Sequence, residues 1–246
     1  MPVKRIRGAS RALEVLEAIA RQQPVNVALL ARHLGEDKSN LQRILMTLAD
    51  DGWIRAAPGR PTRWELTARV YALTHMGQGH SELRHRARPA LDLLRSQTGE
   101  SVLLAIPDVE RLVTIDVIES GHVLRAAPYI GMVIAPGESA AGQAVLAYMT
   151  PDQQARLLGR APDAELAATL SEVRERGWSL NDGAVVHGSA NIGAAILDPD
   201  GSPVAALVVS APSERMPAAD RPRIGLMLID AVRRLSRVEQ SFWSPD

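Results

Sequence analysis

The stretch HLGEDKSNLQRILMTLADDG (33–52) constrains the fold most, because it joins two amphipathic helical patterns through a turn of a few residues. Asn26 is a suitable N-cap for the first of these helices, and Gly35 is a suitable stop signal. Asp37 can cap the next helix, whose apolar residues recur at helical spacing: Leu41, Ile44, Leu45 and Leu48. Two short helices joined by a tight, glycine-containing turn are typical of a helix-turn-helix unit.

The segments on either side of this unit extend it to a winged helix. An earlier amphipathic helix is predicted at 10–22, with Ser10 as its N-cap. After the unit, GWIRAAPGRPTRWELT (52–67) predicts a strand at 53–55, a turn rich in Pro and Gly, and a second strand at 63–66. Three helices followed by a hairpin are the element order of a winged helix-turn-helix domain.

The polar face of the third helix and the tip of the hairpin carry side chains that suit DNA. Arginine can read guanine, asparagine and glutamine can read adenine, and basic residues on a wing can contact phosphates. Residues 1–66 hold 11 Lys/Arg against 7 Asp/Glu, although the whole chain has a formal net charge of +0. A helical protein-interaction domain with a solvated polar face is the alternative. The predicted DNA-binding residues are Lys38, Ser39, Asn40, Gln42, Arg43, Thr47, Arg60 and Arg63.

Composition excludes several other classes of protein. The chain has no cysteine, which rules out disulfides and cysteine-based zinc sites. No apolar run approaches the roughly 20 residues of a membrane span, and no signal peptide is evident, so we expect a cytoplasmic protein without membrane contact. His75, His80 and His85 recur every five residues, which does not stack ligands on one helical face. We therefore expect neither a metal site nor a cofactor.

The rest of the chain predicts an α+β domain. Two helices broken at Gly77–Gly79 fill 67–99, where they could contribute to a dimer seam. Antiparallel strands and packed helices follow. The expected strands are 101–106, 111–118, 122–127, 191–197 and 204–210, and the expected helices are 139–149, 152–159, 164–176 and 217–240. The predicted domains are a winged helix-turn-helix at 1–66, a helical linker at 67–80, and an effector-binding and oligomerisation domain at 81–246.

Four stretches together resemble the IclR family of bacterial transcriptional regulators along nearly the whole chain. They are SRALEVLEAIA (10–20), KSNLQRILMTLADDGWI (38–54), ESAAGQAVLAYM (138–149) and RERGWSLNDGAVVHGSANIGAAILDPDGSPVAALVVSAP (174–212). The resemblance implies a winged helix-turn-helix joined by a helical linker to a GAF-like α/β effector-binding domain. It implies a transcriptional regulator, expected to be a repressor, that is a homodimer or homotetramer, binds a double-stranded DNA operator and a small organic effector, and has no catalytic role.

The same resemblance implies an effector pocket between the loop at 130–142 and the strands at 191–197 and 204–210. The positions that match the family's ligand contacts are Ala140, Ala141, Asn181, Asn191, Val208 and Ser210. This chain departs from the family in having neutral residues where charged ones are frequent, at Gly137, Gln143, Gly183 and Ala184, and Ala195 where the strand usually carries Pro. The pocket is thus less charged than is usual, and the resemblance does not imply which effector it binds.

The stretch GESAAG (137–142) also has the setting of a nucleophile elbow, which makes a small-molecule serine hydrolase using Ser139 the alternative function. His187, the one histidine after it, follows three aspartates, so the order of a catalytic triad is possible. However, the last glycine is displaced by one residue and no H-G-G-G precedes the motif, so we expect no enzyme. A helix starting here could instead seat an effector carboxylate at its N-terminus. Alternatively, the small residues only let the helix pack closely.

Overall fold

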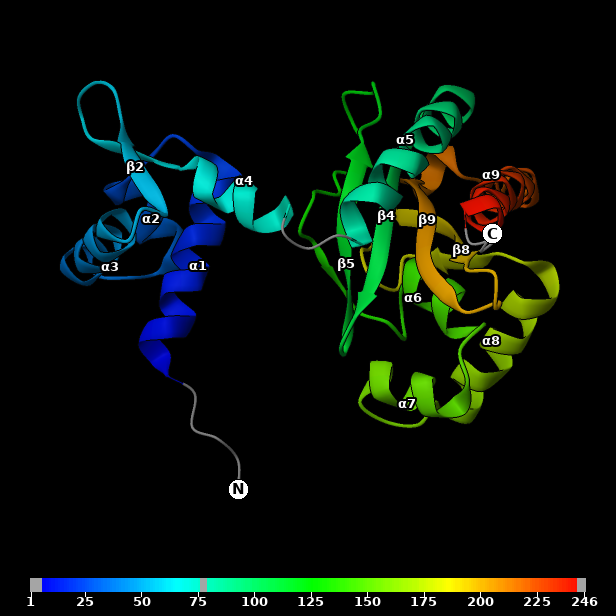
Figure 1. Ribbon diagram of the computed structural model, residues 1–246. Helices are drawn as coiled ribbons and strands as arrows, with labels where there is room; N and C mark the ends of the chain where they lie inside the picture. The colour runs from blue at the N-terminus through cyan, green and yellow to red at the C-terminus, as the bar shows by residue number, and fades with distance from the viewer. Residues whose placement is uncertain (1–5, 76–78, 243–246) are drawn as a thin grey trace. The chain divides into compact units, whose positions relative to one another are not determined.

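The computed structural model describes residues 6–75 and 79–242, and the chain divides into two compact units between residues 78 and 79 (Figure 1). The first unit contains a small three-stranded sheet and four helices, and the second a larger sheet covered by helices on both faces. Within the described residues, no helix combines the length and the apolar character that crossing a membrane requires.

The first unit is a winged helix-turn-helix, as expected. Its antiparallel sheet has the order β1-β3-β2. A core that includes Ile19, Leu30, Leu45 and Trp64 holds the helices and the sheet together. The elements are α1 (Arg7–Gln22), β1 (Val25–Asn26), α2 (Val27–Leu34), α3 (Lys38–Asp50), β2 (Ile54–Ala57), β3 (Arg63–Leu66) and α4 (Ala68–His75).

Side-chain caps start the two helices of the helix-turn-helix where the sequence predicts them. The backbone N–H of Leu29 donates to Asn26 Oδ1 at 2.9 Å, and that of Ser39 donates to Asp37 Oδ2 at 2.8 Å. Gly35 ends α2 with φ +60°, a left-handed conformation that residues with a Cβ rarely adopt. Helix α3 therefore begins only a few residues after α2 ends.

Two local predictions in this unit are wrong. Ser10 does not cap α1, which begins at Arg7 after Ile6 without a side-chain cap, because the helix extends upstream of its first apolar positions. The first wing strand runs over 54–57 rather than 53–55. In addition, no sequence signal predicts strand β1, since two residues are too few to show alternation, and it forms by pairing with β3.

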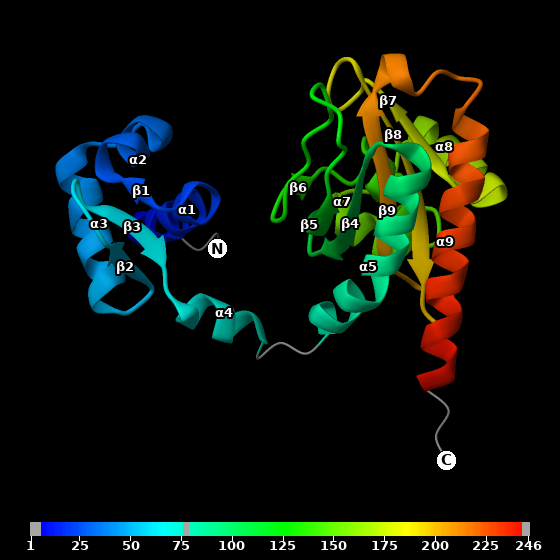
Figure 2. The same ribbon diagram turned by 90° about the horizontal axis from the view of Figure 1, so that it is seen from above.

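The second unit is built on a six-stranded antiparallel sheet of order β6-β5-β4-β9-β8-β7. Helices α5 and α9 lie together on one face, and α6 and α8 pack on the other (Figure 2). The strands are β4 (Ser101–Asp108), β5 (Arg111–Ile118), β6 (Val133–Ile134), β7 (Ser179–Asp182), β8 (Ser189–Leu197) and β9 (Pro203–Pro212). The helices are α5 (Gly79–Thr98), α6 (Ala140–Leu146), α7 (Pro151–Leu158), α8 (Ala164–Arg176), the short 3-10 turn Ser213–Arg215, and α9 (Arg221–Phe242).

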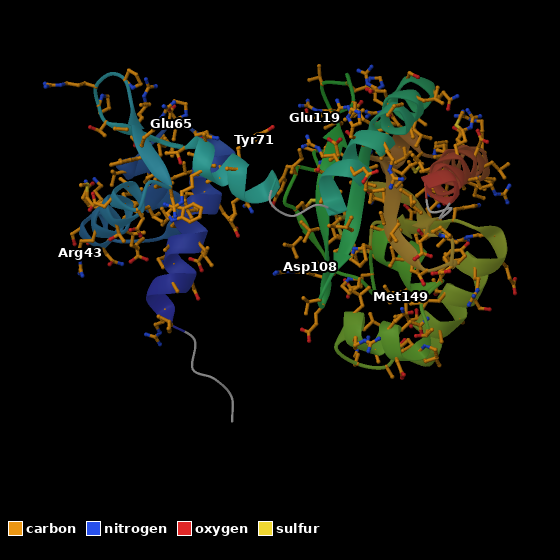
Figure 3. The ribbon with its side chains drawn as sticks, viewed as in Figure 1. Arg43, Glu65, Tyr71, Asp108, Glu119 and Met149 are labelled. Carbon is orange, nitrogen blue, oxygen red and sulfur yellow. The ribbon has the colours of Figure 1, made fainter. Side chains whose placement is uncertain are left out.

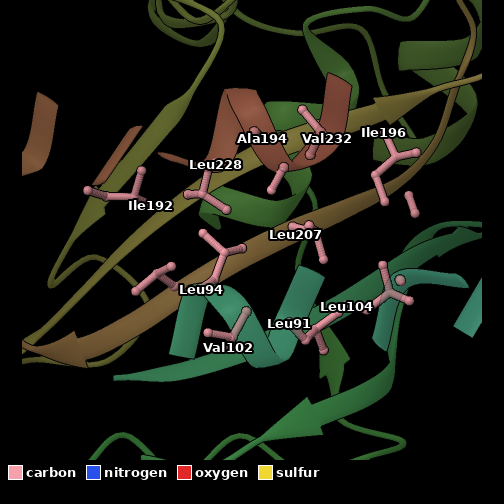
Figure 4. Close-up of a cluster of buried hydrophobic side chains, with 14 of the residues drawn as sticks. Leu91, Leu94, Val102, Leu104, Ile192, Ala194, Ile196, Leu207, Leu228 and Val232 are labelled. Carbon is pink, nitrogen blue, oxygen red and sulfur yellow. The ribbon is translucent and has the colours of Figure 1, made fainter. Parts of the chain in front are cut away.

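The two-residue period of the strands sorts side chains between the two faces of this sheet. In β9, Leu207 and Val209 face the layer of α5 and α9, whereas Ala206 and Val208 face the layer of α6 and α8. Figure 4 shows the first layer, in which Leu91 of α5 packs with the leucines and isoleucines of the central strands. Both faces are apolar because both are covered, which explains the nearly continuous apolar runs of β8 and β9.

The strand expected at 122–127 is also wrong. Side chains rather than a ladder hold this backbone: Ser101 Oγ donates to the carbonyl of Ala126 at 2.7 Å, and Arg215 Nη1 donates to that of Leu124 at 2.9 Å. The segment therefore runs as an irregular loop beside the sheet.

Three of the four leucines of α5 pack within their own unit, whereas Leu93 is exposed. Leu83, Leu91 and Leu94 are buried against the sheet and α9. A dimer seam formed by 67–99 would therefore have to use other side chains than this apolar stripe.

Candidate functional site

Helix α3 presents a polar face to solvent in the first unit. Leu41, Leu45 and Leu48 are buried, Ile44 packs beside them, and the polar side chains of the helix are exposed. All eight residues of the predicted DNA-binding set are exposed: Lys38, Ser39, Asn40, Gln42, Arg43, Thr47, Arg60 and Arg63. Figure 3 shows Arg43 on this helix and Glu65 on the hairpin. The predicted DNA-binding residues therefore lie on two exposed elements, helix α3 and the β2–β3 hairpin.

The wing has different charges at its base and at its tip. At the base, Arg55 Nε donates to Glu65 Oε1 at 2.7 Å across the β2–β3 pair, so this arginine already has a carboxylate partner. For Arg60 and Arg63 near the tip, the described residues supply no ion pair. The tip therefore carries the guanidinium groups available to phosphates.

Several polar groups on α3 already have partners within the chain. The Ser39 hydroxyl donates to the Asp37 carboxylate, and Thr47 Oγ1 donates to the carbonyl of Arg43 at 3.0 Å. Asn40 Nδ2 donates to Glu36 Oε1 at 3.0 Å. These bonds orient the side chains on the exposed polar face of α3.

The start of α1 contributes residues that sequence reasoning missed. Arg7 and Arg11 line the same groove as Glu36, Asn40 and Arg43. The groove exists because α1 crosses α3, and helical periodicity in α1 alone carries no signal of that crossing. In the sequence, the signal that both arginines carry is their place in the basic first quarter of the chain.

The second unit contains a pocket of about 540 Å³ on the sheet face that carries α6 and α8. Its floor is formed by β4, β7, β8 and β9, and its walls by the irregular segments 125–128 and 185–186, by 132–135 with the short strand β6, and by the start of α6. The structure brings all six predicted effector-contacting residues to this pocket: Ala140, Ala141, Asn181, Asn191, Val208 and Ser210. Residues up to 70 positions apart in the chain therefore meet around one cavity.

A row of polar side chains crosses the floor of this pocket. Asn181 pairs with Asn191 in the β7–β8 ladder, and Asn191 pairs with Ser210 in the β8–β9 ladder. Paired residues point to the same face and lie a few ångströms apart, so the three form a continuous polar strip. Leu103 and Val208 supply an apolar floor beside it.

Asn181 leaves one polar atom in this strip without a partner. Its Nδ2 donates to the carbonyl of Glu138 at 2.5 Å. Its Oδ1 is buried, and no described residue donates to it. A buried acceptor without a donor costs free energy, but this oxygen has almost no accessible surface, so a molecule in the pocket would reach it only if the Asn181 side chain moved.

Ser139 has the surroundings of a helix cap rather than of a nucleophile. The N–H of Gly142 donates to Ser139 Oγ at 3.1 Å, and the hydroxyl donates to the carbonyl of Ala135 at 2.6 Å. The hydroxyl proton is thereby directed to a backbone carbonyl and not to an imidazole. His187 lies in an exposed loop, and no hydrogen bond between it and Ser139 is present among the described residues.

The small residues of GESAAG permit close packing of α6. A Cβ added to Gly142 would lie 2.0 Å from the carbonyl oxygen of Pro136, and one added to Gly193 would lie 2.8 Å from that of Ala140. The close-packing explanation of the motif is therefore supported. Ala140 and Ala141 also line the pocket, so packing and pocket shape depend on the same residues.

Charged side chains stand at the edge of the pocket and not along its floor. Of the described residues that line it, Arg125 alone is charged, and its Nη2 lies 2.6 Å from Glu119 Oε2. Nearby, Arg215 forms two hydrogen bonds with the buried Glu100, and these bonds raise the pKa of the Arg215 guanidinium. This pair anchors the 119–128 segment through the Leu124 carbonyl.

Metal chemistry has no support in the part of the chain that the structure describes. No group of three or more His, Cys, Asp or Glu side chains is arranged there to hold a metal ion. The pocket floor is uncharged, with an apolar part beside the strip of Asn181, Asn191 and Ser210, which suits a small organic molecule better than an ion.

Each of the two units matches a model of a known protein family. The sequence model described as "IclR helix-turn-helix domain" matches residues 8–58, and the one described as "Bacterial transcriptional regulator IclR C-terminal" matches residues 77–237. The chain is 28% identical to the HTH-type transcriptional regulator BhcR of Paracoccus denitrificans, over 94% of this chain and 86% of that protein. It is 26% identical to the transcriptional repressor IclR of Escherichia coli, over 94% and 89%.

A solved structure shows the same fold at lower identity. An IclR homologue from Microbacterium hydrocarbonoxydans, complexed with 4-hydroxybenzoate, superposes with a TM-score of 0.75 over 95% of this chain and 99% of that one. The two sequences are 16% identical. The agreement extends over both the DNA-binding and the second unit.

Proposed function

The chain belongs to the IclR family of transcriptional regulators, and from that premise we propose that it is a repressor whose affinity for its DNA operator is set by a small-molecule effector. It is a regulator with a helix-turn-helix domain and an effector-binding domain, not an enzyme. We take 1–66, 67–80 and 81–246 as the DNA-binding, linker and effector-binding segments. The hydrolase alternative at Ser139 has no support from its relatives or from its hydrogen bonds.

The observation that carries the effector proposal is the meeting of six distant residues around one apolar pocket with a polar strip. Ala140, Ala141 and Val208 would contact the apolar body of the effector. Asn181, Asn191 and Ser210 would bind its polar groups. Pockets of this kind, mostly apolar with a few convergent polar groups, are typical of small-molecule sites.

We propose the effector's chemistry from the same geometry. The Asn191 carboxamide and the Ser210 hydroxyl line the pocket side by side and can accept hydrogen bonds, so the proposed effector carries a hydroxyl or an N–H. A carboxylate at the other end would lie toward the start of α6, where the helix dipole favours negative charge. 4-Hydroxybenzoate, which a homologue of the same fold binds, combines these features and serves as the probe.

On the DNA side, we propose that α3 enters the major groove and the wing contacts the backbone. Gln42 and Arg43 would read bases with Asn40, while Lys38, Ser39, Thr47, Arg60 and Arg63 would position the helix on phosphates or assist base contacts. A homodimer or homotetramer would bind a palindromic operator, with half-sites about one helical turn or a multiple apart. Tyr71 and Leu73 on α4 are exposed apolar surface that association could cover.

The decisive experiment measures thermal unfolding and operator binding with 4-hydroxybenzoate, benzoate and methyl 4-hydroxybenzoate. We expect 4-hydroxybenzoate to raise the melting temperature, since a ligand that binds only the folded state stabilises it, and to weaken operator binding. Benzoate lacks the donor and the ester lacks the charge, so each should shift the melting temperature less. If all three leave both readouts unchanged, the proposed effector class is wrong. A monomer by light scattering at micromolar concentration would contradict the proposed assembly.

A further inference from the structure

Glu36, in the turn between α2 and α3, holds the side chain of Asn40. Asn40 Nδ2 donates to Glu36 Oε1 at 3.0 Å. An ionised carboxylate only accepts hydrogen bonds, so the amide nitrogen and not the amide oxygen must face it. The contact therefore fixes the orientation of the Asn40 carboxamide on the exposed polar face of α3.

Glu36 is itself held in place by α1. Its Oε2 lies 2.5 Å from Arg11 Nη2, and Arg11 Nη1 lies 2.5 Å from Glu14 Oε2. The Glu36 side chain is only 17% exposed, although it belongs to a surface turn. The hydrogen bond from Asn40 first, and the charge and hydrogen bond of Arg11 as well, lower the pKa of Glu36. The carboxylate is thus ionised at neutral pH and has both oxygens engaged.

The base that such an asparagine can read follows from hydrogen-bond complementarity. Adenine presents an acceptor (N7) and a donor (N6–H) in the major groove, whereas guanine presents two acceptors (N7 and O6). With one N–H of its amide bound to Glu36, Asn40 has one N–H and its carbonyl oxygen left. That pair matches adenine, and it lacks the second donor that a bidentate contact with guanine needs.

We propose that Glu36, anchored by Arg11, is a positioning residue that makes Asn40 select adenine at one position of the operator. The inference rests on the proposed reading of bases by α3. Arg11 also offsets the negative charge that Glu36 would otherwise bring toward the phosphates. Glu36 thereby affects the choice of base more than the overall strength of binding.

Three substitutions separate these effects. Glu36→Gln keeps the size of the side chain, but an amide can either accept from or donate to Asn40, so it no longer specifies the orientation. Asn40→Ala removes the reading group itself. Glu14→Gln is the matched control, because it removes a carboxylate from the same arginine without touching Asn40.

The experiment uses the full chain and a duplex selected from a random pool. Affinity is measured for the selected operator and for every single-base change, at two salt concentrations. For the wild type we expect one position at which adenine is preferred about ten-fold or more over guanine. Asn40→Ala and Glu36→Gln should both reduce that preference to less than about three-fold, at that position alone, while Glu14→Gln retains it.

The possible failures are distinguishable. If Asn40→Ala abolishes the preference but Glu36→Gln leaves it intact, Asn40 reads the base without Glu36 and the inference is overturned. A Glu36→Gln protein that loses affinity equally at all positions has lost structure, which also overturns it, and its melting curve would show this. If the wild type binds no selected duplex in a salt-dependent manner, the proposed DNA-binding mode itself has failed.

Discussion

Asn191 lies directly opposite Ser210 in the antiparallel β8–β9 pair, and both face the pocket. The next residue of the same row, Asn181, comes from a third strand. A single residue of register slip would turn one member of this row to the opposite face. The recognition chemistry of the pocket therefore depends on sheet register as well as on residue type.

Replacement of Asn191 by Leu should remove ligand binding without unfolding the chain. The two side chains have similar volume, but Leu has no hydrogen-bonding group. We expect the 4-hydroxybenzoate shift in melting temperature to disappear, and operator affinity without the probe to stay within about two-fold, well under the ten-fold change that about 1.4 kcal/mol produces. Ser171→Ala, an exposed change on α8, is the control. An undiminished shift in a folded Asn191→Leu protein would place the effector elsewhere.

Ser139 should behave as a helix cap. Ser139→Ala removes the acceptor for the Gly142 N–H, so it should destabilise the second unit by about 1 kcal/mol in denaturant unfolding. Ser139→Thr keeps the hydroxyl and should retain most of that stability. A fluorophosphonate probe should label neither variant nor the wild type. Stoichiometric labelling of Ser139 in the wild type would instead revive the hydrolase interpretation.

Substitution of Gly142 by Ala tests the close packing of α6 against the preceding loop. Its added Cβ would meet the backbone of Pro136 at 2.0 Å, which a side-chain movement cannot relieve. We expect Gly142→Ala to cost about 1–3 kcal/mol or more and to distort the pocket wall. Gly137→Ala is the matched control, because its nearest contact would be the Leu158 side chain at 3.4 Å. Equal stability of the two variants would contradict the tight contact between α6 and the loop that precedes it.

Much of this fold could be predicted because its signals are local. Asn26 and Asp37 cap the starts of α2 and α3, and Gly35 ends α2. Each acts through contacts within a few residues, so the helix-turn-helix can be predicted from the sequence. The apolar runs of β8 and β9 likewise identify buried strands. The family resemblance, rather than periodicity, pointed to the six residues that the structure brings together around the pocket.

The remaining features depend on contacts between distant residues. Segment 122–127 resembles a short strand in its sequence, yet Ser101 and Arg215 bind its carbonyls, and residues 125–127 form part of the pocket wall instead. The contact between Glu36 and Arg11 requires α1 to cross α3, which neither helix encodes by itself. The start of α1 at Arg7 was also not predicted correctly. A helical pattern identifies the apolar positions of a helix more reliably than it identifies the residue at which the helix begins.

The cap of α3 should make the first unit sensitive to acid. Hydrogen bonds from the Ser39 hydroxyl first, and from the backbone N–H groups of Asn40 and Ser39, lower the pKa of Asp37. A carboxyl whose pKa is lowered on folding stabilises the fold above its unfolded pKa of about 3.9, and that contribution is lost as the pH falls through the folded value.

The measurement is thermal unfolding between about pH 2 and 6, around that unfolded pKa. Asp37→Asn keeps a capping side chain but cannot titrate, so it should flatten the loss of stability at low pH. Ser39→Ala removes the first cause of the shift and should move the loss toward higher pH. A wild-type profile that matches Asp37→Asn throughout would show that this cap does not couple folding to pH.

Arg43 and Arg63 should contribute to DNA binding in different ways. Arg43 projects from the middle of the exposed face of α3, where a guanidinium can bind a guanine through two hydrogen bonds (Figure 3). Arg43→Ala should therefore cost about 1–3 kcal/mol on the selected operator and relax the base preference at one position. On unrelated duplexes its effect should be small.

Arg63 lies on the wing, where a phosphate contact is the expected role. Arg63→Ala should weaken binding to all sequences alike and reduce the slope of log K against log salt by about 0.9, the value for one phosphate contact. Arg156→Ala, an exposed arginine on α7 of the other unit, controls for loss of charge alone. Because base contacts carry sequence information and phosphate contacts carry salt dependence, each arginine should change one readout and spare the other. If Arg63→Ala alters base preference while leaving the salt slope unchanged, the wing reads bases and the division of roles proposed for α3 and the hairpin is wrong.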